Sequence, residues 1–205
     1  MSVSRRAVLM APLPVALWLR SARAADSPTA VIQQFYDVLL SVMKQAKQFT
    51  FDQRYQRLAP AITAAFDLGL TSRLSVGPDW AKLSPDQQKR FSEAFARYTI
   101  SNYANRFDDF NGERFEVDPN PVANPNGMIV QTKLVKSDGD KVTLNYLMRQ
   151  GAGGSWQVID VYLSGTISEL ATRRSEFSSV LRTGGADGLI KLIEDRTAAL
   201  RTARG

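Results

Sequence analysis

The segment between residues 114 and 163 constrains the fold most, because its apolar residues alternate with polar ones instead of recurring at helical spacing. Strands are predicted at 114–117, 128–135, 141–149 and 156–163. Turn-forming sequences separate them, including Asn124-Pro125-Asn126-Gly127 and Ser137-Asp138-Gly139-Asp140. Consecutive strands joined by short turns form an antiparallel meander, so we expect a curved four-stranded antiparallel sheet.

Helical periodicity dominates on both sides of this segment. Ser27-Pro28 and Ser84-Pro85 are typical helix starts, with a side-chain cap followed by proline. We predict helices over 28–48, 50–58, 61–66, 68–76, 85–108, 167–181 and 187–201, with a break at Pro60. Helices that precede and follow a meander in the sequence indicate an α+β domain, and we expect them to pack on one face of the sheet.

The first 24 residues are predicted to be an export signal. Arg5-Arg6 precede a short apolar stretch, and Ala22-Arg23-Ala24 has the small-x-small pattern of a cleavage site. Both a twin-arginine signal and an ordinary secretory signal fit these residues. We therefore expect an export signal at 1–24 and a single domain at 25–205.

The predicted signal carries most of the excess positive charge. The chain has 26 Lys and Arg against 20 Asp and Glu, and four of the arginines lie within 1–24. The remaining chain is close to neutral, which removes the electrostatic argument for binding nucleic acid. We predict no nucleic-acid partner.

The sequence contains neither cysteine nor histidine. This composition excludes disulfides, Ser-His and Cys-His catalysis and the usual zinc sites. We expect no enzymatic activity, no metal and no cofactor.

Asp160 is the acidic residue that most needs an explanation, because it lies within a predicted apolar strand. A buried carboxylate needs a partner. We expect a structural ion pair with Arg173 or Arg174, and a role in binding a ligand head group remains the alternative.

Several motifs resemble the MlaC family of periplasmic lipid-binding proteins, also described as toluene-tolerance auxiliary components of ABC transporters. They are Trp156-x-Val158-x-Asp160-Val161, Gly165-x-x-Ser168, Arg173, Phe177, Gly184-Gly185-x-Asp187-Gly188-Leu189 and, upstream, Leu83-Ser84-Pro85-x-Gln87. The resemblance covers essentially all of 25–205. Met43-Lys44-Gln45 and Gly112-x-Arg114-Phe115 resemble the hopanoid-associated HpnM branch.

This resemblance implies an NTF2-like fold with an apolar pocket for lipid tails between the sheet and the helices. It implies a periplasmic carrier that shuttles phospholipid or hopanoid between an outer-membrane lipoprotein complex and an inner-membrane MCE-type ABC transporter. Periodicity predicts the following pocket residues: Phe66, Leu70, Leu74, Tyr98, Tyr103, Val130, Leu144, Tyr146, Val161 and Leu163.

Two alternatives belong to other functional classes. An NTF2-like enzyme would need an acid inside the pocket, for which Asp160 is the candidate. A scaffold subunit of a transporter would bind its protein partner and no lipid.

Overall fold

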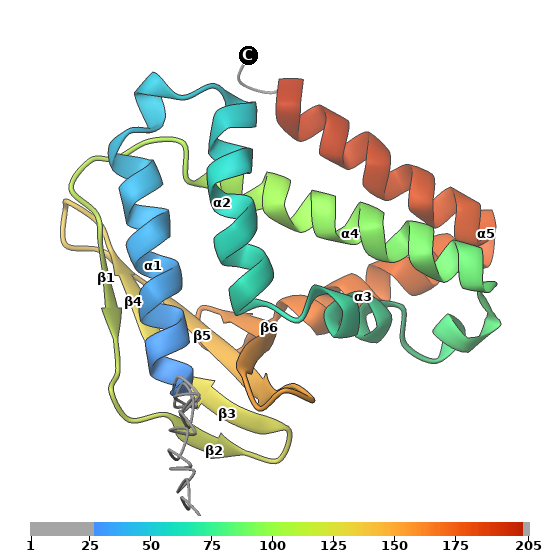
Figure 1. Ribbon diagram of the computed structural model, residues 1–205. Coiled ribbons are helices and arrows are strands. Elements are labelled where there is room, and N and C mark those ends of the chain that lie inside the picture. The colour runs from blue at the N-terminus through green and yellow to red at the C-terminus, as the bar shows by residue number, and fades with distance from the viewer. Residues whose placement is uncertain (1–26, 203–205) are drawn as a thin grey trace, which may run out of the picture.

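A computed structural model describes residues 27–202, and the export signal predicted at 1–24 lies outside these residues. The fold is α+β, with the helices gathered on one side of an open, twisted sheet (Figure 1). The helices are α1 Pro28–Lys44, α2 Phe51–Ala65, α3 Leu68–Val76, α4 Pro85–Arg106 and α5 Glu169–Thr202, with short 3₁₀ turns η1 Ala46–Gln48 and η2 Gly77–Lys82. Within residues 27–202, no helix has both the length and the hydrophobicity needed to cross a membrane.

The sheet is antiparallel throughout, and β5 is its central strand. Its strands are β1 Arg114–Val117, β2 Val122–Asn124, β3 Gly127–Val130, β4 Thr132–Val135, β5 Lys141–Gln150, β6 Trp156–Leu163 and β7 Ile167–Ser168. β3 and β4 pair with successive parts of one edge of β5, and β6 pairs along the other edge.

The predicted count of four strands was too low, because the sheet has seven. The strand expected at 128–135 is interrupted at Gln131, whose carbonyl accepts a hydrogen bond from the backbone N–H of Asp118 at 2.9 Å. The predicted turn at Asn124–Gly127 joins two short strands, β2 and β3, into a hairpin. β7 follows the turn at Gly165, where a helix start was expected. Strands of two or three residues are too short to show an alternating pattern in the sequence.

The helix starts follow from local side-chain caps. Thr50 and Ser84 each form a complete capping box with the glutamine three residues later, Gln53 and Gln87. Such caps satisfy backbone N–H groups that have no partner within the helix.

The predicted break at Pro60 was wrong, because α2 continues through it from Phe51 to Ala65. A proline inside a helix costs about 3 kcal/mol through a lost hydrogen bond and a steric clash. Leu58 and Ile62, on either side of Pro60, are fully buried. Burial of each such side chain contributes roughly 1.5–3 kcal/mol, which offsets the cost.

The apolar interior consists of two clusters. The first cluster joins α1 and α2 to the sheet, and its buried members include Phe35, Leu39, Ile62, Phe66, Tyr146 and Val158. The second cluster joins α3, α4 and α5, and its buried members include Val76, Phe91, Phe95, Phe177, Leu189 and Ile193. Trp156 packs against the first cluster and Trp80 against the second.

Gly185 divides α5 into two helical segments, as predicted from the glycine pair. Its backbone has φ 64° and ψ −170°, a conformation that favours glycine. The kink allows both segments to contribute to the second cluster, through Phe177 before it and Leu189 after it.

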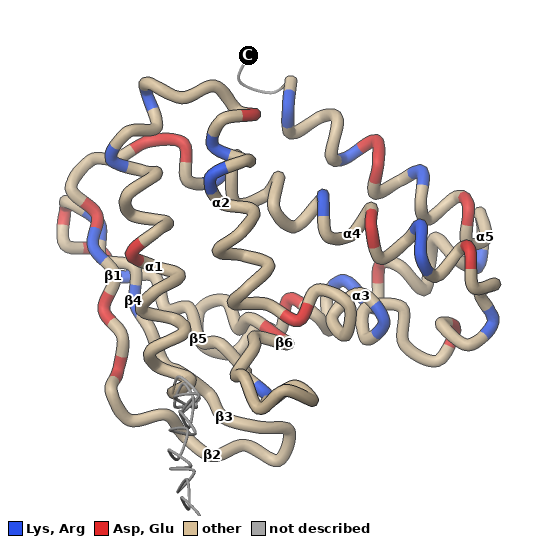
Figure 2. The backbone as a smooth tube through the Cα atoms, in the orientation of Figure 1, with Lys and Arg blue, Asp and Glu red and all other residues tan. Residues whose placement is uncertain are grey.

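Positive and negative side chains are interspersed along α4 and α5, whereas β2 and β3 carry no charged residue (Figure 2). The two helices are linked by ion pairs between Arg90 and Asp187 at 3.0 Å and between Arg97 and Glu194 at 3.6 Å. Such exposed pairs contribute little, about 0–1 kcal/mol each. The contact between α4 and α5 therefore depends mainly on the second cluster.

Candidate functional site

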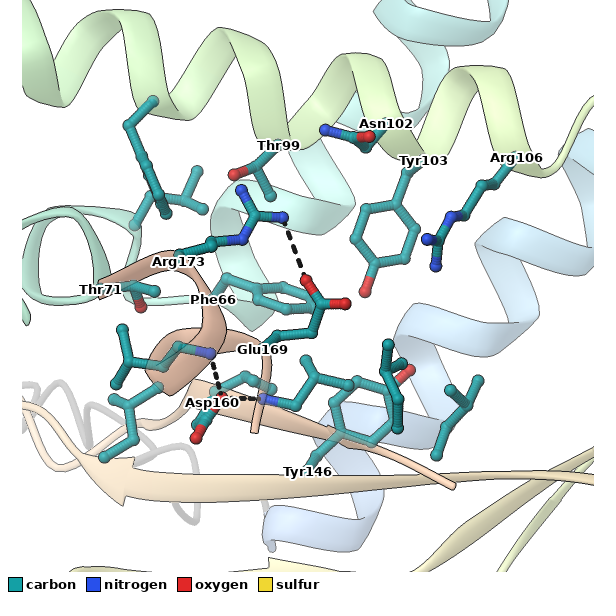
Figure 3. A pocket seen from close by; sticks show the side chains of 18 of the residues that line it. Phe66, Thr71, Thr99, Asn102, Tyr103, Arg106, Tyr146, Asp160, Glu169 and Arg173 are labelled. Atoms are coloured by element: carbon teal, nitrogen blue, oxygen red, sulfur yellow. Dashed lines mark hydrogen bonds and ion pairs between the residues drawn. The ribbon is translucent and has the colours of Figure 1, made fainter. Parts of the chain in front are cut away.

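A pocket lies between the β5–β6 part of the sheet and the helices α4 and α5 (Figure 3). Its cavity has a volume of about 120 Å³. The apolar lining comprises Phe66, Leu68, Phe95, Tyr103, Phe107, Leu144, Tyr146, Val158, Ile159, Val161, Leu163 and Leu170. The polar and charged lining comprises Thr71, Thr99, Asn102, Arg106, Asp160, Glu169 and Arg173.

Six of the ten predicted pocket residues line this cavity. They are Phe66, Tyr103, Leu144, Tyr146, Val161 and Leu163. The structure therefore brings together the strand residues of β5 and β6, the end of α2 and the face of α4 that carries Tyr103. A contact between these residues and lipid stays a prediction.

The other four predicted residues do not line the cavity. Leu70 lines a separate pocket with Arg73 and Trp80, and Leu74 lies half-buried on α3. Val130 is completely buried in the first cluster. Tyr98 packs against the second cluster. Successive residues of a helix are rotated by about 100°, so Tyr98 lies on a different face of α4 from its neighbour Thr99, which lines the cavity.

The lining of α4 follows a single helical face that could have been found in the sequence. Phe95, Thr99, Asn102, Tyr103 and Arg106 recur at spacings of three and four residues. The prediction selected only apolar positions, so it missed the three polar members of this face.

A β-bulge explains why consecutive residues of β6 reach the pocket. Leu147 pairs with Asp160 and the next residue, Met148, pairs with Val158, so Ile159 has no partner on β5. A bulge interrupts the alternation of a strand and redirects its side chains. As a result, all four residues from Val158 to Val161 line the cavity.

Asp160 holds the start of α5, and its predicted ion pair with Arg173 or Arg174 was wrong. Its Oδ1 accepts hydrogen bonds from the backbone N–H groups of Val161 at 2.7 Å and Leu170 at 3.0 Å. Its Oδ2 accepts from the hydroxyl of Ser168 at 2.5 Å. The first turn of α5 presents N–H groups and a positive dipole to the strand, which satisfies the carboxylate without an arginine.

The two arginines have other partners. Arg173 Nη2 lies 3.3 Å from Glu169 Oε2, one turn earlier on α5. Arg174 Nε donates a hydrogen bond to the carbonyl of Leu74 at 3.0 Å and so links α5 to α3. Both arginines therefore contact groups on the helices α3 and α5.

Three buried tyrosines connect the pocket to the first cluster. The hydroxyl of Tyr36 lies 2.6 Å from Thr132 Oγ1 and donates to the hydroxyl of Tyr146 at 3.0 Å. Tyr146 also shares a hydrogen bond with Tyr103. Burial raises the pKa of Tyr36 to about 12, and it also raises the pKa values of Tyr103 and Tyr146 well above the ordinary value. The phenols are therefore neutral at physiological pH and add no charge to the pocket.

One wall of the pocket is polar, in addition to the apolar lining that the resemblance implied. The guanidinium of Arg173 lies 5.6 Å from the ring centroid of Phe95 and 5.2 Å from that of Tyr98. Arg106 adds a second positive charge from the last turn of α4 (Figure 3). Across residues 27–202, no group of three or more acidic side chains is placed to hold a metal ion.

Comparisons with known proteins give a consistent picture. The MlaC protein family matches residues 33–195 of the chain. The toluene tolerance protein ttg2D of Pseudomonas putida is 26% identical over 172 residues, which cover 80% of this chain and 77% of that protein. The crystal structure of a phospholipid-binding protein from Ralstonia solanacearum, in complex with a phospholipid, superposes with a TM-score of 0.74 at 22% identity. The match covers 85% of this chain and 99% of that one. The chain belongs to the MlaC family.

Proposed function

We propose that this protein is a periplasmic phospholipid carrier and the soluble component of an MCE-type ABC transport system. The observation that carries the proposal is the pocket between the sheet and α4, with twelve apolar lining residues. The Ralstonia protein of the same fold was solved with a phospholipid. The name of the Pseudomonas relative, a toluene tolerance protein, agrees with a role at the cell envelope.

The energetics of lipid transfer explain why such a carrier needs an apolar pocket. Each buried methylene group contributes roughly 0.8 kcal/mol, so two acyl chains of about 16 carbons contribute on the order of 25 kcal/mol. A carrier must offer the chains a comparably dry environment during transfer. It needs no reactive group for this task.

The volume of the cavity implies that the pocket widens when it is loaded. A cavity of about 150 Å³ holds one benzene molecule, and the cavity here has about 120 Å³. Two acyl chains are several times larger than benzene. We expect the sheet and α4 to separate as lipid enters, because lining residues come from both.

The pocket acids support a carrier rather than an enzyme. Both oxygens of Asp160 accept hydrogen bonds that hold α5, and Glu169 is paired with Arg173. A general acid or base must be free to exchange a proton with the substrate. We therefore propose that the protein has no catalytic activity.

Lipid extraction from the purified protein, followed by mass spectrometry, tests the proposal. We expect about one phospholipid per protein in the wild type, and a hopanoid in its place would assign the protein to the HpnM branch. Val161→Trp fills the cavity and should lower the lipid content several-fold. Val122→Trp, at a position 48% exposed on β2, is the matched control and should retain lipid.

Absence of bound lipid would contradict the proposal. Wild-type protein that contains no lipid, and takes up none from phospholipid vesicles, would refute the carrier. If such lipid-free protein still bound the membrane complex, it would be a scaffold subunit. Transfer of labelled lipid to vesicles that contain the inner-membrane transporter tests the proposed partner.

A further inference from the structure

Two buried polar atoms in the pocket wall have no hydrogen-bond partner. Across residues 27–202 there are three such side-chain atoms: Arg173 Nη1, Thr99 Oγ1 and Ser101 Oγ. The first two belong to residues that line the cavity, one from α5 and one from α4. Figure 3 shows the two side chains close to each other on the same wall.

The surroundings of Arg173 make its unused donor costly. Its guanidinium lies beside the rings of Phe95 and Tyr98, and its side chain is only 21% exposed. Its one ion pair is a single 3.3 Å contact from Nη2 to Glu169. A buried donor without a partner loses its hydration and gains nothing in return.

The charges facing this wall favour an acceptor with negative charge. Arg106 and Arg173 line the cavity together with Asp160 and Glu169. The carboxylate of Asp160 is occupied by donors from the start of α5. Glu169, the other acid that lines the cavity, pairs with Arg173 at 3.3 Å, and Arg106 adds a second cation to the lining.

We propose that Arg173 and Thr99 form a subsite for an anionic oxygen of the bound lipid. The guanidinium binds the oxygen through its free edge, and the Thr99 hydroxyl donates a second hydrogen bond. A phospholipid phosphate and a fatty-acid carboxylate both present such an oxygen, and Arg suits both because its planar donors can bind two oxygens at once. This proposal rests on the lipid-carrier function and adds a selectivity for lipids that carry an anionic group.

Glu169 has a defined place in this scheme. It occupies one edge of the guanidinium in the present structure, so it keeps the arginine paired before lipid enters. An incoming phosphate competes with it for the same cation. Glu169→Gln is therefore expected to tighten the binding of an anionic lipid several-fold.

Equilibrium binding to delipidated protein tests the subsite with three probes: dioleoylphosphatidylglycerol, dioleoylglycerol and oleate. The first two share their acyl chains and differ in the phosphate. We expect the wild type to bind the phospholipid roughly tenfold to a hundredfold more tightly than the diacylglycerol. Arg173→Met should bring the two affinities close together. Arg173→Lys should give an intermediate ratio, and Thr99→Val a smaller loss than Arg173→Met.

Arg182→Met is the matched control, because it removes the same charge from an exposed position of α5 and should keep the wild-type ratio. Circular dichroism checks that each variant folds. If Arg173→Met does not fold, the lipid preference of Thr99→Val tests the subsite in its place. A folded Arg173→Met that still prefers the phospholipid as the wild type does would overturn the subsite. If Arg173→Met loses affinity for oleate and for neither of the other two probes, the subsite binds a carboxylate. Wild type that binds all three probes equally would refute the subsite and leave the carrier intact, whereas binding of none would refute the carrier.

Discussion

Replacing Asp160 with alanine tests how the strand β6 holds the helix α5. The change removes the acceptor for the Leu170 N–H, the Val161 N–H and the Ser168 hydroxyl. Each buried donor left without a partner costs about 1–3 kcal/mol, and the loss of a helix cap typically costs about 1 kcal/mol. Water can reach some of these groups at the pocket, so we expect a total near the lower end, about 3 kcal/mol.

This loss should be visible as a lower melting temperature. For a domain of this size, 1 kcal/mol corresponds to about 2–4 °C, so Asp160→Ala should melt roughly 6–12 °C below the wild type. Asp160→Asn keeps one acceptor oxygen and should lose about half as much.

Thermal melts by circular dichroism, together with lipid content by mass spectrometry, check the Asp160 prediction. We expect the variant that folds at low temperature to keep its lipid at the same stoichiometry. An unchanged melting temperature with loss of lipid would refute our reasoning, because the carboxylate would then act on the cargo instead of on α5.

Two further predictions concern the buried tyrosines and a close backbone contact. The pKa of Tyr36 is raised to about 12, against about 10 in an unfolded chain. The unfolded state therefore loses its proton first, and stability should fall as pH rises from about 10 to 12. Tyr36→Phe should make this fall shallower in urea titrations at pH 8 to 11, and an unchanged slope would contradict the assignment. At Gly127, a Cβ atom would lie 2.0 Å from the carbonyl oxygen of Met148, so Gly127→Ala should destabilise the β2–β3 hairpin by at least about 1–3 kcal/mol. Gly153→Ala is the control, since nothing lies within 4 Å of its Cβ position, and equal melting temperatures for the two variants would refute the steric argument.

The features that were predicted correctly depend on neighbouring residues. Ser84 caps α4 through contacts with Gln87, three residues away, and Gly185 divides α5 through its own backbone conformation. Such effects are contained in a short stretch of sequence.

The features that were missed depend on residues far apart in the chain. Two of the donors to Asp160 lie on β7 and α5, and they reach it because the chain folds back onto β6. Their positions in the sequence do not reveal this contact. The pocket wall joins Thr99 to Arg173, which belong to different helices. Pro60 was expected to end a helix, because its local cost was visible and the burial of Leu58 and Ile62 was not.

The pocket lies where the two apolar clusters meet, since Phe66 belongs to the first cluster and Phe95 to the second. A lipid chain at this position would contact both clusters and so couple their unfolding. The cooperativity of unfolding would then depend on whether cargo is bound. Trp156 reports on the first cluster and Trp80 on the second, so fluorescence of single-tryptophan variants would show two transitions merging into one as lipid is added.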